Sequence, residues 1–182
     1  MGRATVGGVG VASDLGYEHK APGAVRGAMQ RFASTRFGAW AFSKTLQPID
    51  HVVRKLSKGR TSAPQVLAGL PVLFVTTTGR KSGEPRTAPL IAVPVGDTLA
   101  LLGTNFGQTS TPAWVFNLEA DPTATATYKD AELAVRARPA TDVERDEVWA
   151  ASKAIYPGYE KYRERITDRE VRIFVLEPAA TS

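Results

Sequence analysis

The sequence predicts a mainly β domain with flanking helices, built as an antiparallel barrel or sandwich. Short apolar runs rich in β-branched residues recur after residue 70, and turn signals containing Gly, Pro and Asp separate them. Few helical patterns lie between these runs, so most connections are hairpins. A doubly wound parallel sheet does not fit this order.

The predicted strands follow one another along the chain. The first is the apolar run over residues 70–78. A second strand over residues 88–95 ends at Gly96-Asp97, and residues 98–103 form its antiparallel return. The remaining strands are expected at residues 123–128, 131–138 and 171–176, with a turn at Lys129-Asp130 between the first two.

Two helices are expected among these strands. A hydroxyl residue in 109–111 can cap the first, Pro112 suits its first helical position, and it stops before Asp121-Pro122. The second begins with a capping box from Thr141 to Glu144 and continues to about residue 155. Pro157 then breaks or redirects the chain.

Charge and composition divide the chain into three parts: a flexible leader (1–22), a basic helical segment (23–62) and the barrel (63–182). Residues 1–62 hold ten Lys or Arg against three Asp or Glu, within a net charge of +5 for all 182 residues. Arginines and apolar residues alternate at near-helical spacing over 25–44, which favours a helix that packs on the domain or lies on an anionic membrane.

Neither a secretory signal nor a continuous apolar run long enough to span a bilayer is apparent. We therefore expect a cytoplasmic protein, peripheral to the inner face of the membrane if the basic helix binds lipid. The chain has no cysteine and only two histidines, His19 and His51. This composition excludes disulfides and thiolate nucleophiles and argues against a metal site, so an enzyme of this kind would borrow its reactivity from an organic cofactor.

The turn over residues 79–86 concentrates three cations, a hydroxyl and two glycines directly after the first strand. Glycine allows a sharp turn and brings backbone N–H groups close to a ligand, and the cations add charge-assisted donors. The turn is either an anion-binding site or a solvated basic loop, and its glycine spacing does not match a nucleotide P-loop. The residues concerned are Gly79, Arg80, Lys81, Ser82, Gly83 and Arg86.

Aromatic residues mark two further candidate positions. Trp114 lies in the first turn of its helix, near Thr104 and Asn105 at a strand end, where a helix N-terminus suits an electron-rich ligand. Its alternative role is to fill the core. Three tyrosines at spacing i, i+3, i+6 share one helix face and either clamp a flat ligand or pack against the sheet. They are Tyr156, Tyr159 and Tyr162.

Several of these motifs occur together in a fixed order, at residues 76–86, 89–90, 112–118, 121–122 and 156–159. In order and spacing they resemble the deazaflavin-dependent nitroreductase and quinone reductase family of actinobacteria. The resemblance covers roughly residues 65–178.

The resemblance implies a split β-barrel of the flavin-reductase type that binds coenzyme F420 and passes a hydride to quinones, nitroaromatics or activated enones. The coenzyme carries a phosphodiester and a polyglutamate tail, which would give the basic turn its anion. By the resemblance, the cofactor-binding residues are Arg80, Lys81, Ser82, Gly83, Arg86, Thr104, Asn105 and Asn117, and the substrate-pocket residues are Trp114, Tyr156, Tyr159 and Tyr162.

One position departs from the resemblance, and other functions stay open. Well-known family members have Ser-Lys where this chain has Thr104-Asn105, so the hydroxyl near the ring is kept and a cation is lost.

An FMN-binding split-barrel reductase and a non-catalytic F420 carrier or sensor are the alternatives. We expect no nucleic-acid binding, because surface aromatics do not alternate with basic residues, whereas pairing into a homodimer is common among such barrels.

Overall fold

The computed structural model describes residues 10–18 and 71–179. The described strands are β1 (Val72–Thr78), β2 (Pro85–Ile91), β3 (Val93–Val95), β4 (Thr98–Leu102), β5 (Thr123–Tyr128), β6 (Ala131–Pro139) and β7 (Ile173–Pro178). The described helices are α1 (Val11–Leu15), the short 3-10 helix η1 (Asn105–Gly107), α6 (Ala113–Ala120), α7 (Asp142–Ile155) and α8 (Gly158–Arg165).

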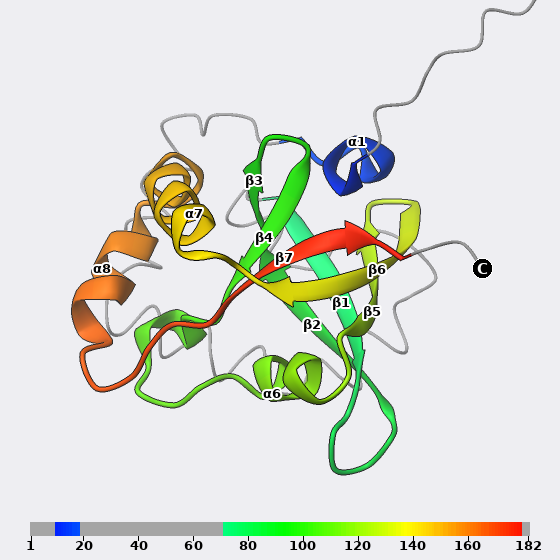
Figure 1. Cartoon of the computed structure of the whole chain (residues 1–182), viewed down its shortest axis with the longest axis horizontal. Coiled ribbons are helices and arrows are strands. Elements are labelled where there is room, and N and C mark those ends of the chain that lie inside the picture. Colours follow the sequence, from blue (N-terminus) through cyan, green and yellow to red (C-terminus); the bar gives the residue numbers. More distant parts are fainter. Residues whose placement is uncertain (1–9, 19–70, 180–182) are drawn as a thin grey trace, which may run out of the picture.

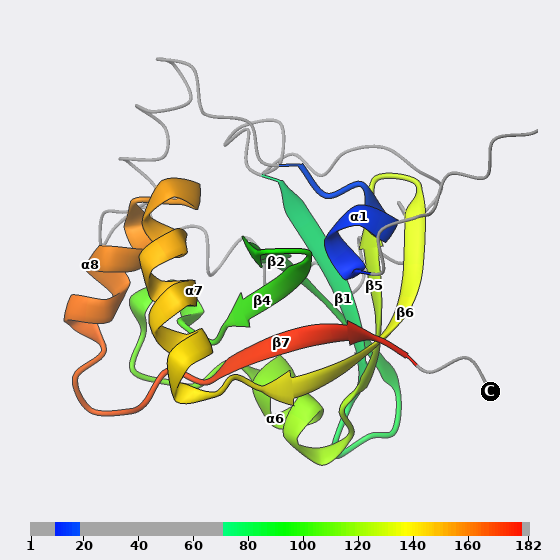
Figure 2. The ribbon, with the colours of Figure 1, turned by 45° about the horizontal axis from the view of Figure 1, so that its top comes forward.

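The described strands form one antiparallel sheet in the order β2-β1-β5-β6-β7-β4-β3 (Figure 1). The two edge strands, β2 and β3, are separated in the chain by Ala92 alone. The two edges of the sheet therefore have to meet, and the sheet curls to bring them together (Figure 2). This arrangement confirms the prediction of a mainly β, antiparallel barrel.

The seam at Ala92 corrects one predicted strand. We expected residues 88–95 to form a single strand paired with its return over residues 98–103. The first part instead belongs to β2 and pairs with β1, whereas Val93–Val95 pairs with β4. A local pattern of apolar residues does not reveal that the chain crosses from one sheet edge to the other.

Most other element predictions are confirmed. β5 has the predicted bounds, and Lys129 at the following turn has a φ of 53°. The capping box of α7 is present, and the chain turns at Pro157 into α8. α6 begins one residue later than expected, since Pro112 has extended backbone and no side chain caps the helix.

Side chains alternate across the sheet between two buried clusters. On β4, Leu99 and Leu101 point into the barrel interior, whereas Leu102 faces α7 and α8. α6 covers another side of the barrel, next to the β1–β2 turn (Figures 1 and 2). Both faces of β4 are therefore covered, which explains its continuous apolar sequence.

Residues 10–18 contribute to the barrel core, whereas we expected them to belong to a flexible leader, the rest of which lies outside the described residues. Val11, Leu15 and Tyr17 are buried against the barrel. The Tyr17 hydroxyl lies 2.8 Å from the carbonyl oxygen of Pro71 and 3.0 Å from that of Ala92, and accepts the Ala92 N–H at 3.2 Å. α1 and Tyr17 thus fix the seam at which the two sheet edges meet.

The predicted basic helix over residues 25–44 lies outside the described residues, as does the rest of the segment 23–62. Within residues 10–18 and 71–179, no helix is long and apolar enough to cross a membrane.

An ion-pair network joins α7 to the sheet and predicts an acid-sensitive stability. Arg138 donates to both carboxylate oxygens of Glu144 at 2.7 and 2.6 Å and to Glu177 at 2.6 Å. The Arg138 guanidinium, followed by the Thr141 N–H, lowers the pKa of Glu144 to about 2 from an ordinary value of 4.5. The resulting stabilisation is present above pH 4.5 and is lost as the pH falls toward 2.

We expect Glu144→Gln to lower the free energy of unfolding at pH 7 by about 1 kcal/mol, a modest value because the Arg138 and Glu144 side chains are 37% and 27% exposed. Urea unfolding at a series of pH values measures the free energy of unfolding, and the difference between wild type and variant should disappear toward pH 2. Glu147→Gln is the control, since Glu147 makes no ion pair with a described residue. An equal loss in both variants would contradict this account.

Candidate functional site

The turn between β1 and β2 is closed by its own backbone hydrogen bonds. The Gly79 N–H donates to the Glu84 carbonyl at 2.8 Å, and the Ser82 and Gly83 N–H groups donate to the Gly79 carbonyl at 3.1 and 2.8 Å. A Cβ at position 79 would lie 2.8 Å from the Ser82 Oγ and 3.1 Å from the Glu84 carbonyl oxygen, so the compact turn requires glycine there. Gly83 has a φ of 71°, which also favours glycine.

These bonds correct one expectation about the turn. We expected its backbone N–H groups to approach a ligand, but those of Gly79, Ser82 and Gly83 are occupied within the turn. The Arg80 N–H is occupied as well, by Asn117. Of residues 79–84, Lys81 alone has an N–H without a hydrogen bond to a described residue, so most of the donors that the turn offers to an anion are side chains.

Asn117 fixes the turn against α6. Its Oδ1 accepts the Arg80 N–H at 3.1 Å, and its Nδ2 donates to the Thr77 Oγ1 at 3.0 Å. The Asn117 side chain is buried, and both ends of its amide are used in these bonds. Its first task is thus to hold the start of the turn in place.

A cleft of about 700 Å³ lies between this turn, β2 and α6. Cations from the turn are among the lining residues, as is Trp114 on α6. Arg80 places its guanidinium 4.4 Å from the centre of the Phe116 ring, which holds the cation at the edge of the cleft. The lining residues are Gly79, Arg80, Lys81, Ser82, Arg86, Thr87, Ala88, Pro89, Thr111, Ala113, Trp114, Phe116 and Asn117.

The cleft suits a ligand with an anionic chain and a flat ring. Among the described residues, no carboxylate forms an ion pair with Arg80 or Lys81, and both side chains are exposed. Their charges are therefore available to phosphate or carboxylate groups. Trp114 is mostly buried and packs edge-on against Phe174 with 6.1 Å between ring centres, so its position is fixed.

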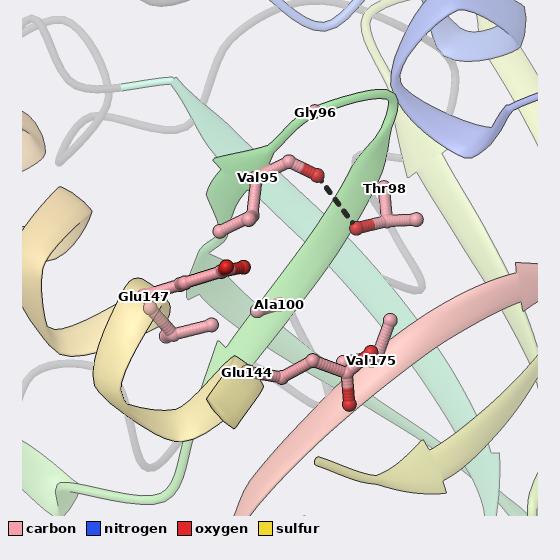
Figure 3. Close-up of a pocket in the computed structure, with 8 residues that line it drawn as sticks. Val95, Gly96, Thr98, Ala100, Glu144, Glu147 and Val175 are labelled. Carbon is pink, nitrogen blue, oxygen red and sulfur yellow. Dashed lines mark hydrogen bonds between the residues drawn. The ribbon is translucent and has the colours of Figure 1, made fainter. Parts of the chain in front are cut away.

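A second, smaller cleft has the opposite charge. It has a volume of about 290 Å³ and lies between α7, the β3–β4 hairpin and β7 (Figure 3). Glu144 and Glu147 line it together with small apolar side chains, and the carboxylate of Glu147 points toward the hairpin. Glu144 is paired with Arg138, but Glu147 pairs with no described cation and disfavours an anionic cofactor here, so charge selects the cleft beside the turn.

The three tyrosines lie elsewhere, in the buried cluster under α7 and α8. The hydroxyls of Tyr156 and Tyr162 are 3.2 Å apart, and the Tyr159 hydroxyl donates to the Ile91 carbonyl at 2.8 Å. All three rings contact one another and are almost fully buried. Burial raises the pKa of each phenol, so each is protonated at neutral pH.

Two further predicted cofactor residues, Thr104 and Asn105, lie beside the cleft rather than on its lining. Thr104 is buried, and the Asn105 Nδ2 donates to the carbonyl and hydroxyl of Ser110 at 3.0 Å each. Asn105 has a φ of 46°, a conformation that asparagine tolerates better than most residues. The structure therefore brings together Arg80, Lys81, Ser82, Arg86, Trp114 and Asn117 in one cleft, without Gly83, Thr104, Asn105 or the tyrosines.

Sequence reasoning missed the β2 and α6 residues that complete the cleft. Thr87, Ala88 and Pro89 follow the basic turn and line the cleft. Their position could have been predicted, because a strand that leaves a ligand-binding turn continues along the ligand. Phe116 had no such signal. Its pairing with Arg80 depends on how α6 packs on β1.

Comparison with known proteins assigns the family. The model of the F420H(2)-dependent quinone reductase family matches residues 49–178. The chain belongs to this family. The predicted resemblance and the deazaflavin cofactor, coenzyme F420, are confirmed by this membership, and the protein is an F420-dependent oxidoreductase.

Individual members of the family are similar at moderate identity. An F420H(2)-dependent quinone reductase of Mycobacterium tuberculosis is 28% identical over 109 residues, which cover 58% of this chain and 72% of that protein. The solved structure of an F420-H2 dependent reductase is 34% identical with a TM-score of 0.54, covering 59% of this chain and 94% of the other. A structure described as a domain-swapped dimer is 30% identical with a TM-score of 0.56, covering 72% and 100%. The predicted split β-barrel is thereby confirmed.

Proposed function

We propose that this member of the family reduces quinones with F420H2, holding the anionic end of the coenzyme at the basic turn and its ring toward Trp114. The observation that carries the proposal is the cleft itself. It joins two exposed cations that pair with no described carboxylate to a fixed aromatic ring.

The side chains of the turn have distinct tasks in this proposal. Arg80 and Lys81 bind phosphate and glutamate oxygens, and Ser82 adds a hydroxyl that also accepts the Glu84 N–H at 3.3 Å. Arg86 lies beside Ser82, with 3.5 Å between its Nη2 and the Ser82 Oγ, and extends the positive charge along β2. When bound, the reduced coenzyme supplies the hydride.

The protein's contribution to the reaction is orientation and charge. No described cysteine or metal-binding cluster offers a second reactive group. Nitroaromatics and activated enones are further acceptors in this proposal, because each presents an electrophilic centre to a hydride. The proton that follows would come from water or from a tyrosine hydroxyl.

The proposal includes contact between the tyrosines and the substrate, which requires a change in the structure. Tyr156, Tyr159 and Tyr162 are buried and absent from the cleft lining. They would reach a substrate only if α8, which carries Tyr159 and Tyr162, and the end of α7 beside Tyr156 moved away from the sheet. Trp114 meets no such condition, since it already lines the cleft.

The function is tested by mixing the protein with F420H2 and a panel of quinones, nitroaromatics and enones, and following the absorbance of the oxidised deazaflavin. We expect quinones to be reduced fastest. Tight F420 binding without turnover of any acceptor would favour a carrier or sensor. Equilibrium titration with FMN under the same conditions should show much weaker binding, and tighter FMN binding would contradict the proposal.

We also propose that the basic segment over residues 25–44 attaches the protein to anionic membranes, where lipid-dissolved quinones occur. Sedimentation with anionic liposomes measures this. Replacing Arg26, Arg31 and Arg36 with Gln should lower the bound fraction severalfold, since each basic residue contributes about 1 kcal/mol near such a surface. This variant is preferable to a deletion of residues 1–62, which would remove α1 from the core. Equal binding by wild type and variant would refute the attachment.

Pairing into a homodimer remains a proposal that light scattering of the purified full chain would test. A mass of one chain at micromolar concentration would contradict it.

A further inference from the structure

The segment between β4 and α6 contains the most unusual backbone of the described residues. Asn105, Phe106 and Gly107 have consecutive positive φ values of 46°, 56° and 76°. This conformation is unfavourable for side chains other than glycine, and it persists only where the surroundings hold it. The structure must therefore contain groups that stabilise this segment.

Arg169 is the principal such group. It lies between α8 and β7, and its Nη1 donates to the carbonyl of Gly103 at 3.0 Å. Its Nη2 donates to the carbonyls of Thr104 at 3.3 Å and Gln108 at 3.1 Å. One planar guanidinium thus joins the start of the strained segment to its end, which a point charge on a single nitrogen would not do as well.

The environment of Arg169 indicates that its charge is used for these carbonyl groups. No described carboxylate lies within ion-pair distance of Arg169, and its Nε–H is buried without a hydrogen-bond partner. Partial burial of a cation without an ion pair costs free energy. The hydrogen bonds to three carbonyl groups offset this cost.

The clamped segment lies between the tyrosine cluster and the cleft. Gly107 packs against Tyr162, since a Cβ on this glycine would lie 2.9 Å from the Tyr162 Cδ1. The Asn105 side chain donates hydrogen bonds to Ser110. Thr111, which follows Ser110 in the chain, lines the cleft. A displacement of the segment would therefore move the cleft wall and the start of α6, which carries Trp114.

We propose that Arg169 is a positioning residue for the coenzyme ring. It holds residues 103–108 in the strained conformation that keeps Thr111 and the first turn of α6 in the cleft wall, where the ring would lie. This inference rests on the proposed function, because it assumes that the ring lies toward Trp114. Arg169 itself does not line the cleft and acts through the segment that it clamps.

The test compares two ligands by fluorescence titration: oxidised F420, and a fragment that keeps the deazaflavin ring but lacks the phosphodiester and glutamates. In Arg169→Ala we expect the dissociation constants of both ligands to rise by the same factor, about 10 to 100. Titrations are made at a temperature at which circular dichroism shows each variant to be folded. A purely structural role would lower the melting temperature and leave these constants unchanged.

Arg172→Ala is the matched control, because Arg172 lies in the same connection between α8 and β7 as Arg169 but is exposed and pairs with Glu119 at 3.1 Å. We expect its dissociation constants to stay within about twofold of wild type. If Arg169→Ala does not fold, Arg169→Lys keeps the charge on one nitrogen and should still weaken both ligands severalfold. Wild-type constants in a folded Arg169 variant overturn the inference, whereas failure of the wild type to bind F420 overturns the proposed function itself.

Discussion

Replacing Arg80 and Lys81 together by alanine is expected to raise the dissociation constant of F420 by a factor of about 30 to 1,000. Each cation contributes about 1 to 2 kcal/mol to the binding of an anionic chain, less than in a buried site because both side chains are exposed. Binding of the ring fragment should change little. The Michaelis constant for the quinone should also change little, since the acceptor does not contact the turn in this account.

The matched control removes two cations remote from the cleft. Lys153→Ala with Arg163→Ala lowers the net charge equally on α7 and α8, where these residues contact Glu160 and Trp149. Its F420 affinity should stay near that of wild type. Affinity for F420 should also fall with salt more steeply in wild type than in the Arg80 and Lys81 variant. Unchanged affinity in that variant would remove the turn from the cofactor site.

The largest effect on stability is expected for Val11→Asp combined with Leu15→Asp. Both side chains are buried in the barrel core, and α1 holds the seam through Tyr17. Loss of two apolar side chains and burial of two carboxylates should cost about 5 kcal/mol or more, comparable with the whole stability of a small domain.

Chemical denaturation followed by circular dichroism measures this loss, and a chain unfolded at 25 °C is an expected result. Asp14→Asn, on the exposed side of the same helix, is the control and should shift the midpoint little. Full stability of the double variant would show that α1 is dispensable for the barrel, as the predicted flexible leader implied.

Local sequence signals predicted the elements that local chemistry determines. The capping box at Thr141, the breaks at the prolines and the glycines of the basic turn each act within a few residues, so the sequence reveals them. The same holds for the cations of the cleft, which adjoin one another in the chain. These side chains are accessible to a ligand because a polar turn normally lies on the protein surface.

Features that depend on distant parts of the chain escaped prediction. Residues 10–18 are too short a stretch for apolar periodicity to indicate burial. Tyr17 obtains its hydrogen-bond partners, Pro71 and Ala92, only when the distant strands are assembled. The split of residues 88–95 between two sheet edges likewise follows from barrel closure. The clamp by Arg169 joins residues more than 60 positions apart through backbone carbonyls, which have no sequence signature.

The tyrosines show how one pattern is compatible with two roles. Their spacing predicted one shared helix face, which is wrong for Tyr156: it follows α7 with extended backbone, and only Tyr159 and Tyr162 lie on α8. Both alternatives, ligand contact and packing on the sheet, were open. In the structure, Tyr159 packs on the sheet and bonds to the carbonyl of Ile91. A ligand role would require a rearrangement of α8 that spacing alone cannot reveal.

A crystal structure of the protein with oxidised F420 would show directly where the coenzyme binds. We expect it in the cleft between the β1–β2 turn and α6, with its phosphodiester or glutamates within hydrogen-bond distance of Arg80 and Lys81 and its ring toward Trp114. Coenzyme bound beside Glu144 and Glu147, or with its ring at the turn and its tail away from the cations, would refute this binding site.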